Sequence, residues 1–163
     1  MPLAPPHPRL RILVADGDRA VLTILRHGLE DAGAEVVSAG DGTSALRQLV
    51  DHLLGLDLLV TGLELPVLDG RSLVRIVRAE GGETELPIMV LATTVTPQDR
   101  ELLAHLGVTE IVEKHQGSVH AVRRAVALAA AAHDRRVEAL GPEDAPIPVP
   151  IGRLAPAHEP VAR

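Results

Sequence analysis

Charged and hydroxyl side chains that could do chemistry stand at the ends of the apolar runs in this sequence, namely Asp16, Glu64, Thr93 and Lys114. Carboxylates, hydroxyls and ammonium groups serve phosphoryl transfer, in which an oxygen attacks while cations neutralise the developing charge. A hard divalent cation needs several oxygen donors, so Asp16 alone is a weak anchor, and we expect magnesium binding to be weak or absent. Lys114 could instead form a structural ion pair with Asp16 or Glu64, or Glu64 could point to solvent.

Short apolar runs alternate with amphipathic segments, which predicts five strand-and-helix repeats. The predicted strands cover 11–15, 36–39, 58–61, 87–92 and 108–113, and the predicted helices cover 19–31, 43–54, 70–79, 96–106 and 118 to about 140. This alternation implies an α/β fold with a parallel sheet and helices on both faces. Ligands in such folds bind beyond the C-terminal ends of the strands, where the four side chains above would meet.

Composition limits the function classes. The 163 residues suffice for one core, and with a formal charge of -6 and no aromatic residue the chain is a poor candidate for nucleic-acid binding. The absence of cysteine excludes disulfides and thiolate chemistry. The longest apolar run, 125–132, is too short to span a bilayer, and prolines near the start disfavour a signal peptide. We expect a cytoplasmic protein without a membrane partner.

Proline-rich segments flank the periodic part of the chain. Residues 1–8 are expected to be flexible, residues 9–140 to form the domain, and residues 141–163 to be a disordered tail. Alternating prolines in 146–151 leave a docking strand or polyproline segment as the alternative. No helix-turn-helix pattern follows the domain, which predicts a stand-alone module.

The apolar run Leu58-Leu59-Val60-Thr61 is followed by the turn sequence Pro66-Val67-Leu68-Asp69-Gly70. This combination resembles the third-strand signature of receiver domains from two-component response regulators. The resemblance implies a flavodoxin-like (βα)5 sandwich with a parallel sheet of order 2-1-3-4-5. In that family an aspartate four residues before the proline accepts a phosphoryl group from a histidine kinase. Here that position is Gly62, which has no side chain to phosphorylate.

Two further active-site positions depart from the family pattern. Receivers carry two adjacent acids after the first strand that help to hold magnesium, and here they are Asp16 and Gly17. The family's hydroxyl residue at the end of the fourth strand is Ala92, with Thr93 one residue later. A one-residue shift along a strand points the side chain to the other face, so Thr93 is an imperfect substitute unless the strand is bulged.

At the fifth strand, Lys114 matches the family's lysine, but two positions near it depart from the family pattern. Ile111 stands where the family has an aromatic switch residue, and His115 replaces the proline after the lysine. That Lys-Pro bond is commonly cis in the family. A non-proline cis bond costs about 2.5–4 kcal/mol, so we predict a trans Lys114-His115 bond. Asp18 is interpreted as the N-cap of the first helix rather than as a metal ligand.

No catalytic motif is present. The sequence has no P-loop, no GxGxxG after a strand and no GxSxG. Five histidines fall on predicted helices without paired spacing and are interpreted as solvated surface residues, namely His27, His52, His105, His120 and His133.

The resemblance therefore predicts a degenerate receiver that is not an enzyme and has no cofactor. We expect a protein-interaction module in two-component or phosphorelay signalling that works without aspartyl phosphorylation. One alternative is phosphorylation at a nearby oxygen, of Thr61, Glu64 or Asp69. Another is a small-ligand sensor that uses the pocket enlarged by Gly17 and Gly62.

The expected partner is a signalling protein, either a histidine kinase or a downstream regulator. A homodimer through the fourth helix, fifth strand and fifth helix is a further hypothesis, because the fifth helix is long and rich in alanine. The candidate interaction face comprises Ile111, Val119, Val122, Val126 and Val137.

Overall fold

The computed structural model describes residues 9–52, 55–80 and 86–144, so the predicted N-terminal segment and almost all of the predicted tail lie outside the described residues. The strands are β1 (Arg11–Ala15), β2 (Glu35–Ala39), β3 (Leu58–Gly62), β4 (Ile88–Ala92) and β5 (Glu110–Glu113). The helices are α1 (Arg19–Asp31), α2 (Gly42–His52), α3 (Gly70–Glu80), α4 (Pro97–His105), the 3-10 turn η1 (Lys114–Gln116) and α5 (Ser118–Asp144). The predicted boundaries differ from these by at most two residues, except that α5 continues four residues past 140.

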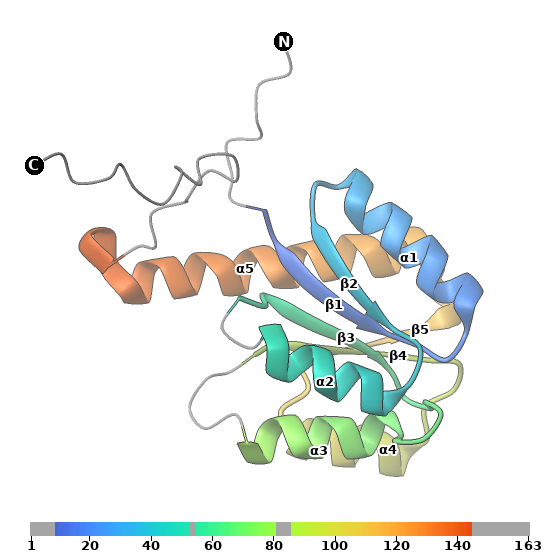
Figure 1. Cartoon of the computed structure of the whole chain (residues 1–163). Coiled ribbons are helices and arrows are strands. Elements are labelled where there is room, and N and C mark those ends of the chain that lie inside the picture. The colour runs from blue at the N-terminus through green and yellow to red at the C-terminus, as the bar shows by residue number, and fades with distance from the viewer. Residues whose placement is uncertain (1–8, 53–54, 81–85, 145–163) are drawn as a thin grey trace, which may run out of the picture.

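The five strands form one parallel sheet of order β2-β1-β3-β4-β5, with helices on both sides (Figure 1). This is the predicted flavodoxin-like order. Helices cover both faces of the sheet, and accordingly β3 and β4 are buried along their whole length.

Successive strand residues pack on opposite sides of the sheet and build two aliphatic cores. Leu13 and Ala15 face the core under α2, α3 and α4, whereas Ile12 and Val14 face the core under α1 and α5. On α5, small side chains four residues apart lie against the sheet at Ala121, Ala125 and Ala129, all of them buried. Because these side chains are small, α5 approaches the strands closely without any aromatic residue to fill a gap.

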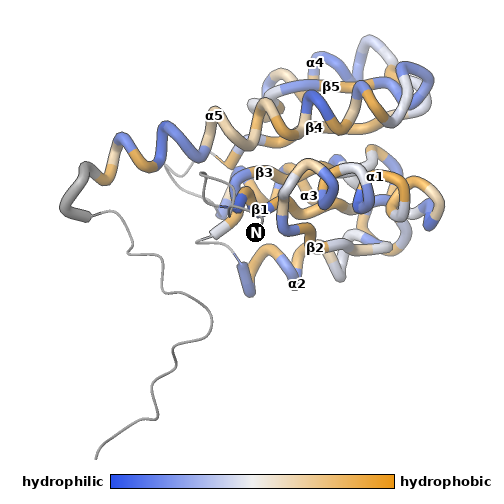
Figure 2. Tube along the Cα trace, turned by 90° about the horizontal axis from the view of Figure 1, so that it is seen from above, coloured by the Kyte–Doolittle hydropathy of each residue, from blue (hydrophilic) through white to orange (hydrophobic). Residues whose placement is uncertain are grey.

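The C-terminal part of α5 extends past the rest of the described chain in both views (Figures 1 and 2). Val137 and Leu140 on this extension are 42% and 41% exposed. None of the helices in the described ranges is both long and apolar enough to cross a membrane.

Local signals fix the helix starts as the sequence predicts. Thr96 caps α4 by accepting a hydrogen bond from the Asp99 amide at 3.1 Å, and Pro97 takes the first helical position. Asp18 caps α1 by accepting from the Ala20 amide at 2.8 Å. The interpretation of Asp18 as an N-cap is therefore confirmed.

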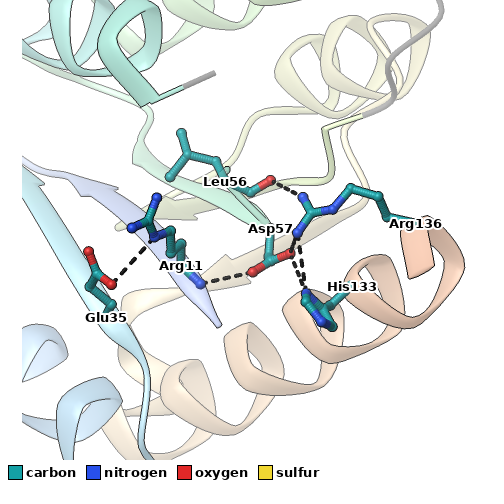
Figure 3. Close-up of polar contacts among 6 residues, drawn as sticks. All are labelled: Arg11, Glu35, Leu56, Asp57, His133 and Arg136. Atoms are coloured by element: carbon teal, nitrogen blue, oxygen red, sulfur yellow. Dashed lines mark hydrogen bonds and ion pairs between the residues drawn. The ribbon is translucent and has the colours of Figure 1, made fainter. Parts of the chain in front are cut away.

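The interpretation of His133 as a solvated surface residue is wrong. The His133 side chain on α5 is only 14% exposed, and its Nδ1 lies 3.1 Å from Oδ1 of Asp57, just before β3 (Figure 3). Asp57 is 1% exposed and also receives the Arg136 guanidinium at 2.7 Å and the Arg11 amide at 2.9 Å. The extension of α5 is therefore anchored to the N-terminal end of the sheet by a buried carboxylate.

A second ion pair joins α3 to α4 and gives a pH prediction. Arg71 donates two hydrogen bonds to the Asp99 carboxylate, at 2.8 and 3.1 Å. These bonds lower the pKa of Asp99 from 3.8 to about 2. A carboxylate with a lowered folded-state pKa stabilises the fold above its unfolded-state pKa, and that stabilisation is lost as the pH falls through its folded-state value.

We therefore expect wild-type protein to lose stability more steeply than Asp99→Asn as the pH falls from 3.8 to about 2. The measurement is urea unfolding followed by far-UV circular dichroism at several pH values. Taking the difference between the two proteins removes the contribution of the other carboxylates. Identical pH slopes would contradict the prediction.

Candidate functional site

The loops after β1, β3 and β4 and the residue after β5 enclose a pocket of about 430 Å³. It lies at the C-terminal ends of the strands, where the fold class predicts a ligand site. The predicted site residues that line it are Asp16, Gly17, Glu64, Ala92, Thr93 and Lys114. Gly62, the last residue of β3, is buried and is not among the residues that line the pocket, although its neighbours Asp16 and Leu65 are.

Asp16 and Lys114 form an ion pair at the floor of this pocket. Lys114 Nζ lies 2.9 Å from Asp16 Oδ2, with the lysine side chain 30% exposed and the aspartate side chain 3% exposed. Asp16 Oδ1 accepts a hydrogen bond from the Asp18 amide at 2.9 Å. Oδ2 has no partner with hydrogen-bonding geometry in the described residues, so its contact with the ammonium is ionic. Of the two predicted partners of Lys114, the structure selects Asp16.

Gly62 borders the same carboxylate. A Cβ placed on Gly62 would lie 3.2 Å from Asp16 Oδ2 and 3.4 Å from a Leu65 methyl. A Cβ on Gly17 would lie 3.0 Å from Pro66 Cδ. At both glycines, neighbouring side chains therefore occupy part of the space that a larger side chain would need.

The hydroxyl at the end of β4 is displaced as the sequence predicts. Ala92 is buried and pairs in regular register with Glu113 of β5, so the strand is not bulged there. Thr93 is exposed and, with Thr94, still lines the pocket because the strand has already ended. Thr93 is thus available to a ligand although it lies one residue after the family's hydroxyl position.

Glu64 and the residues around Lys114 occupy the rim. Glu64 is exposed and lies close enough to Arg71 to help raise the pKa of that guanidinium, after the larger effect of Asp99. His115 turns away from the pocket and contacts Glu113. The described residues contain no cis peptide bond, so Lys114-His115 is trans as predicted.

The pocket does not fit magnesium. In the part of the chain that the structure describes, no three Asp, Glu or His side chains are grouped closely enough to hold a metal ion. The buried oxygen of Asp16 already faces an ammonium group. A small cation that demands near-octahedral oxygen coordination would find one carboxylate where it needs several.

The sequence model of the response regulator receiver domain matches residues 12–126 of this chain. The chain belongs to the response regulator receiver family. It is 34% identical to the transcriptional regulatory protein PrrA of Mycobacterium leprae over 143 residues, which is 85% of this chain and 60% of that protein. Against PrrA of Mycobacterium tuberculosis the identity is 39% over 90 residues, which is 55% of this chain and 37% of that protein.

Solved receivers share the fold. The Francisella response regulator 1452 receiver domain superposes with a TM-score of 0.66 at 24% identity, over 76% of this chain and 98% of that one. Vibrio cholerae CheY4 gives a TM-score of 0.64 at 25% identity, over 72% of this chain and 99% of that one. The chain therefore spans a complete receiver fold but 60% or less of the PrrA proteins it matches.

The five residues of the candidate interaction face do not form one surface, because they lie on both sides of the sheet. Ile111 packs on the core under α2, α3 and α4, whereas Val122 and Val126 pack on the core under α1 and α5. A Cβ on Gly28 of α1 would lie 2.7 Å from a Val122 methyl, so Val122 is engaged within the domain. Val119 and Val137, 66% and 42% exposed, remain available to a partner.

Val67 beside the pocket carries backbone strain. Its φ is 70°, in the left-handed region that a β-branched residue rarely adopts, and it is 87% exposed. We expect Val67→Gly to raise the free energy of unfolding by about 1 kcal/mol, because glycine adopts this conformation without the steric cost. Urea unfolding followed by circular dichroism measures the change. Val67→Ala keeps the strain and serves as the control, and equal stabilities for the two variants would contradict the explanation.

Proposed function

We propose that this receiver works as a protein-interaction module in two-component signalling without aspartyl phosphorylation. The observation that carries the proposal is Gly62 at the family's acceptor position, with its neighbour Asp16 already paired to Lys114 at 2.9 Å. Without an acceptor carboxylate, the domain lacks the oxygen that would attack a phosphoryl donor.

The ion pair also supplies the charge balance that a bound cation would otherwise give. A buried carboxylate without a partner is costly, and the lysine ammonium offsets that cost permanently. The pocket is thus electrostatically satisfied without a phosphoryl group or a metal ion. A partner would accordingly meet the same conformation whatever the activity of a kinase.

Intact mass spectrometry after incubation with magnesium and acetyl phosphate tests this proposal. We expect an unchanged mass, while a conventional receiver treated in parallel gains one phosphoryl group. Treatment with hydroxylamine distinguishes an acyl phosphate from a phosphate ester. A stoichiometric adduct on this chain would overturn the proposal.

Phosphorylation at another oxygen is the second candidate, and the structure favours one position for it. Thr61 is fully buried and its hydroxyl donates to the Gly62 carbonyl at 3.0 Å. Asp69 accepts from the Ser72 amide at 2.7 Å, which lowers the pKa of the Asp69 carboxyl. Glu64 is exposed at the pocket rim. Any adduct would therefore be expected on Glu64, and Glu64→Gln would abolish it.

The proposed partner is a histidine kinase or a downstream regulator, met in the cytoplasm. Relatives of this receiver include the transcriptional regulatory protein PhoP of Bacillus subtilis and the sensor protein GacS of Pseudomonas syringae. A segment similar to this chain thus occurs in a protein named as a transcriptional regulator and in one named as a sensor, which supports a partner of either type.

Self-association through α4, β5 and α5 is proposed from the exposed residues of the α5 extension, Val137 and Leu140. Light scattering at tens of micromolar should give a dimer mass for wild type and a monomer mass for Val137→Glu. The control is Val50→Glu, since Val50 is 71% exposed on α2, away from this surface. A monomer mass for wild type would exclude the dimer.

A further inference from the structure

Residues 66–68, between β3 and α3, form a tight turn that we call the strap. The Leu68 amide donates a hydrogen bond to the Pro66 carbonyl at 2.8 Å, and φ of Val67 between them is 70°. A bond that spans two residues around a positive φ is the rare and strained form of the γ-turn. A β-branched residue is poorly suited to its centre, so Val67 stores backbone strain.

Few contacts hold the strap in this strained form. The Pro66 carbonyl also accepts a hydrogen bond from the amide of Gly42, the first residue of α2, at 3.2 Å. Val67 is 87% exposed, and within the described ranges it makes no hydrogen bond. The strain is therefore opposed by two backbone hydrogen bonds and by the packing of Leu68 on the core under α2, α3 and α4.

The strap fits against α2 only because residue 42 is a glycine. A Cβ on Gly42 would lie 1.8 Å from the Leu68 carbonyl oxygen and 2.7 Å from the Leu68 Cβ, so a side chain there requires the strap to move. On the other side, a Cβ on Gly17 would lie 3.0 Å from Pro66 Cδ. The strap thus connects the start of α2 with the loop after β1. Because Pro66 lines the pocket, a movement of the strap changes the pocket wall.

Two opposing effects of similar size act on the strap. A positive φ at a non-glycine residue destabilises the strained turn, and the two hydrogen bonds to the Pro66 carbonyl stabilise it by a free energy of the same order. A negative φ at Val67 removes the strain, but it moves the Leu68 carbonyl out of its fit against Gly42. When such effects nearly cancel, two conformations coexist, with the minor one at roughly 0.1–10% of the population.

We infer that the strap is a two-state conformational switch in the pocket wall. In the first state, which the structure shows, φ of Val67 is positive and Pro66 closes the wall against Gly17. In the second state, φ of Val67 is negative, the Gly42 amide has lost its bond to Pro66, and the wall is open. A ligand or partner that contacts the strap in one state shifts the balance between the two. The inference does not depend on the proposed absence of phosphorylation, because it rests on the backbone geometry of the strap.

Substitutions at residue 67 should shift the balance in opposite directions. Glycine adopts a positive φ without steric cost, so Val67→Gly should lower the population of the second state at least about fivefold. Proline fixes φ at about −65°, so Val67→Pro should hold the strap in the second state. Proline removes no hydrogen bond there, because the Val67 amide donates none within the described residues. Val67→Ala keeps the strain and is the control, which should behave as wild type does.

Amide hydrogen exchange at Gly42 measures the population of the second state, because this amide is bonded to Pro66 only in the first. Relative to wild type, Val67→Gly should slow the exchange at least about fivefold, and Val67→Pro should accelerate it. Val67→Ala should leave the rate unchanged. Equal exchange rates at Gly42 in wild type, Val67→Gly and Val67→Pro overturn the inference.

Two-dimensional ¹H-¹⁵N NMR gives a second measurement, at the amides of Gly17, Leu65 and Gly70, which we call the reporter amides. No substitution in the series falls on these residues or directly beside them. Each reporter signal of wild type should lie on a straight line between its positions in Val67→Gly and Val67→Pro, and nearer to Val67→Gly. A strap with one conformation would give shifts in unrelated directions, and that result overturns the inference.

Gly42→Ala tests the switch from outside the strap. The added methyl group would meet the Leu68 carbonyl oxygen, so the reporter signals should move along the same line toward Val67→Pro. Gly40→Ala is the matched control, because a Cβ on Gly40 has no atom within 4 Å, and it should leave the signals in place. Should Val67→Pro fail to fold, the positions in Val67→Gly, wild type and Gly42→Ala still define the line. Reporter signals of Gly42→Ala that leave this line overturn the inference.

Discussion

Replacing Arg136 by methionine is expected to lower the free energy of unfolding by about 3 kcal/mol, the lower end of the cost of removing one charged partner from a buried ion pair. Asp57 is 1% exposed, and Arg136 is its guanidinium partner at 2.7 Å. Methionine keeps most of the apolar stem, so the loss comes from the charge and from the hydrogen bond to the Leu56 carbonyl at 3.1 Å. The Arg136 side chain is 38% exposed, so we expect a loss in the free energy of unfolding at the lower end of this range.

Urea unfolding followed by far-UV circular dichroism measures the effect, since a chain without Trp or Tyr has no useful intrinsic fluorescence. Arg135→Met is the matched control, because Arg135 is an exposed neighbour on the same helix. The double variant Asp57→Asn with Arg136→Met should recover much of the loss, because asparagine carries no charge to leave unpaired. Equal stabilities of Arg135→Met and Arg136→Met would contradict the role of the anchor.

The anchor at Asp57 also explains why α5 is ordered beyond the edge of the sheet. Helical propensity alone is a weak source of stability, and most of it comes from tertiary contacts. His133 and Arg136 are three residues apart on one face of α5, and both reach the same carboxylate. The alanine-rich stretch before them packs on the β-strands. Core packing thus stabilises the first part of α5, and the ion pair stabilises the part that follows.

The sheet and the pocket could be predicted from the sequence because local signals specify them. Apolar runs of about five residues separated by amphipathic segments leave few alternatives to a parallel sheet. Once the strand ends are known, Asp16, Thr93 and Lys114 must converge, and they do. The pairing of Lys114 with Asp16 rather than Glu64 could not be predicted, because it depends on side-chain reach across the pocket.

The Asp57 anchor was not predictable in the same way. Its partners lie 76 and 79 residues away along the chain, and His133 carries no local sign that distinguishes it from exposed histidines. A single acid directly before the apolar residues of β3 was the available signal, since an acid at that place needs a partner. Likewise, the alternation of Ile111 and Val112 predicts opposite faces, but not which face α5 covers.

The largest change in ligand response is expected from the triple variant Gly17→Asp, Gly62→Asp and Ala92→Thr. It places acids beside Asp16 and a hydroxyl at the end of β4. Without metal, the clustered carboxylates repel one another, and new Cβ atoms at 3.0 Å from Pro66 and 3.2 Å from Asp16 require small shifts. We expect a loss of about 2 kcal/mol in the free energy of unfolding from these effects.

Magnesium should reverse that loss. Binding to the folded state alone stabilises it by about 2.7 kcal/mol when the ion is at a hundred times its dissociation constant. Thermal melts by circular dichroism with and without magnesium, at matched ionic strength, measure the gain. The control variant carries Gly17→Asn, Gly62→Asn and Ala92→Thr, which imposes similar shapes without the added charges and should show no magnesium dependence.

Phosphorylation of this variant requires more than metal binding does. The new acid at position 62 would have to displace the Lys114 ammonium from Asp16, and His115 leaves that lysine on a trans peptide. We therefore expect restored magnesium binding with at most trace labelling by acetyl phosphate. A folded triple variant whose melt does not respond to magnesium would mean that the carboxylates at 16, 17 and 62 do not converge. Gly62 could then no longer be regarded as the vacant acceptor position.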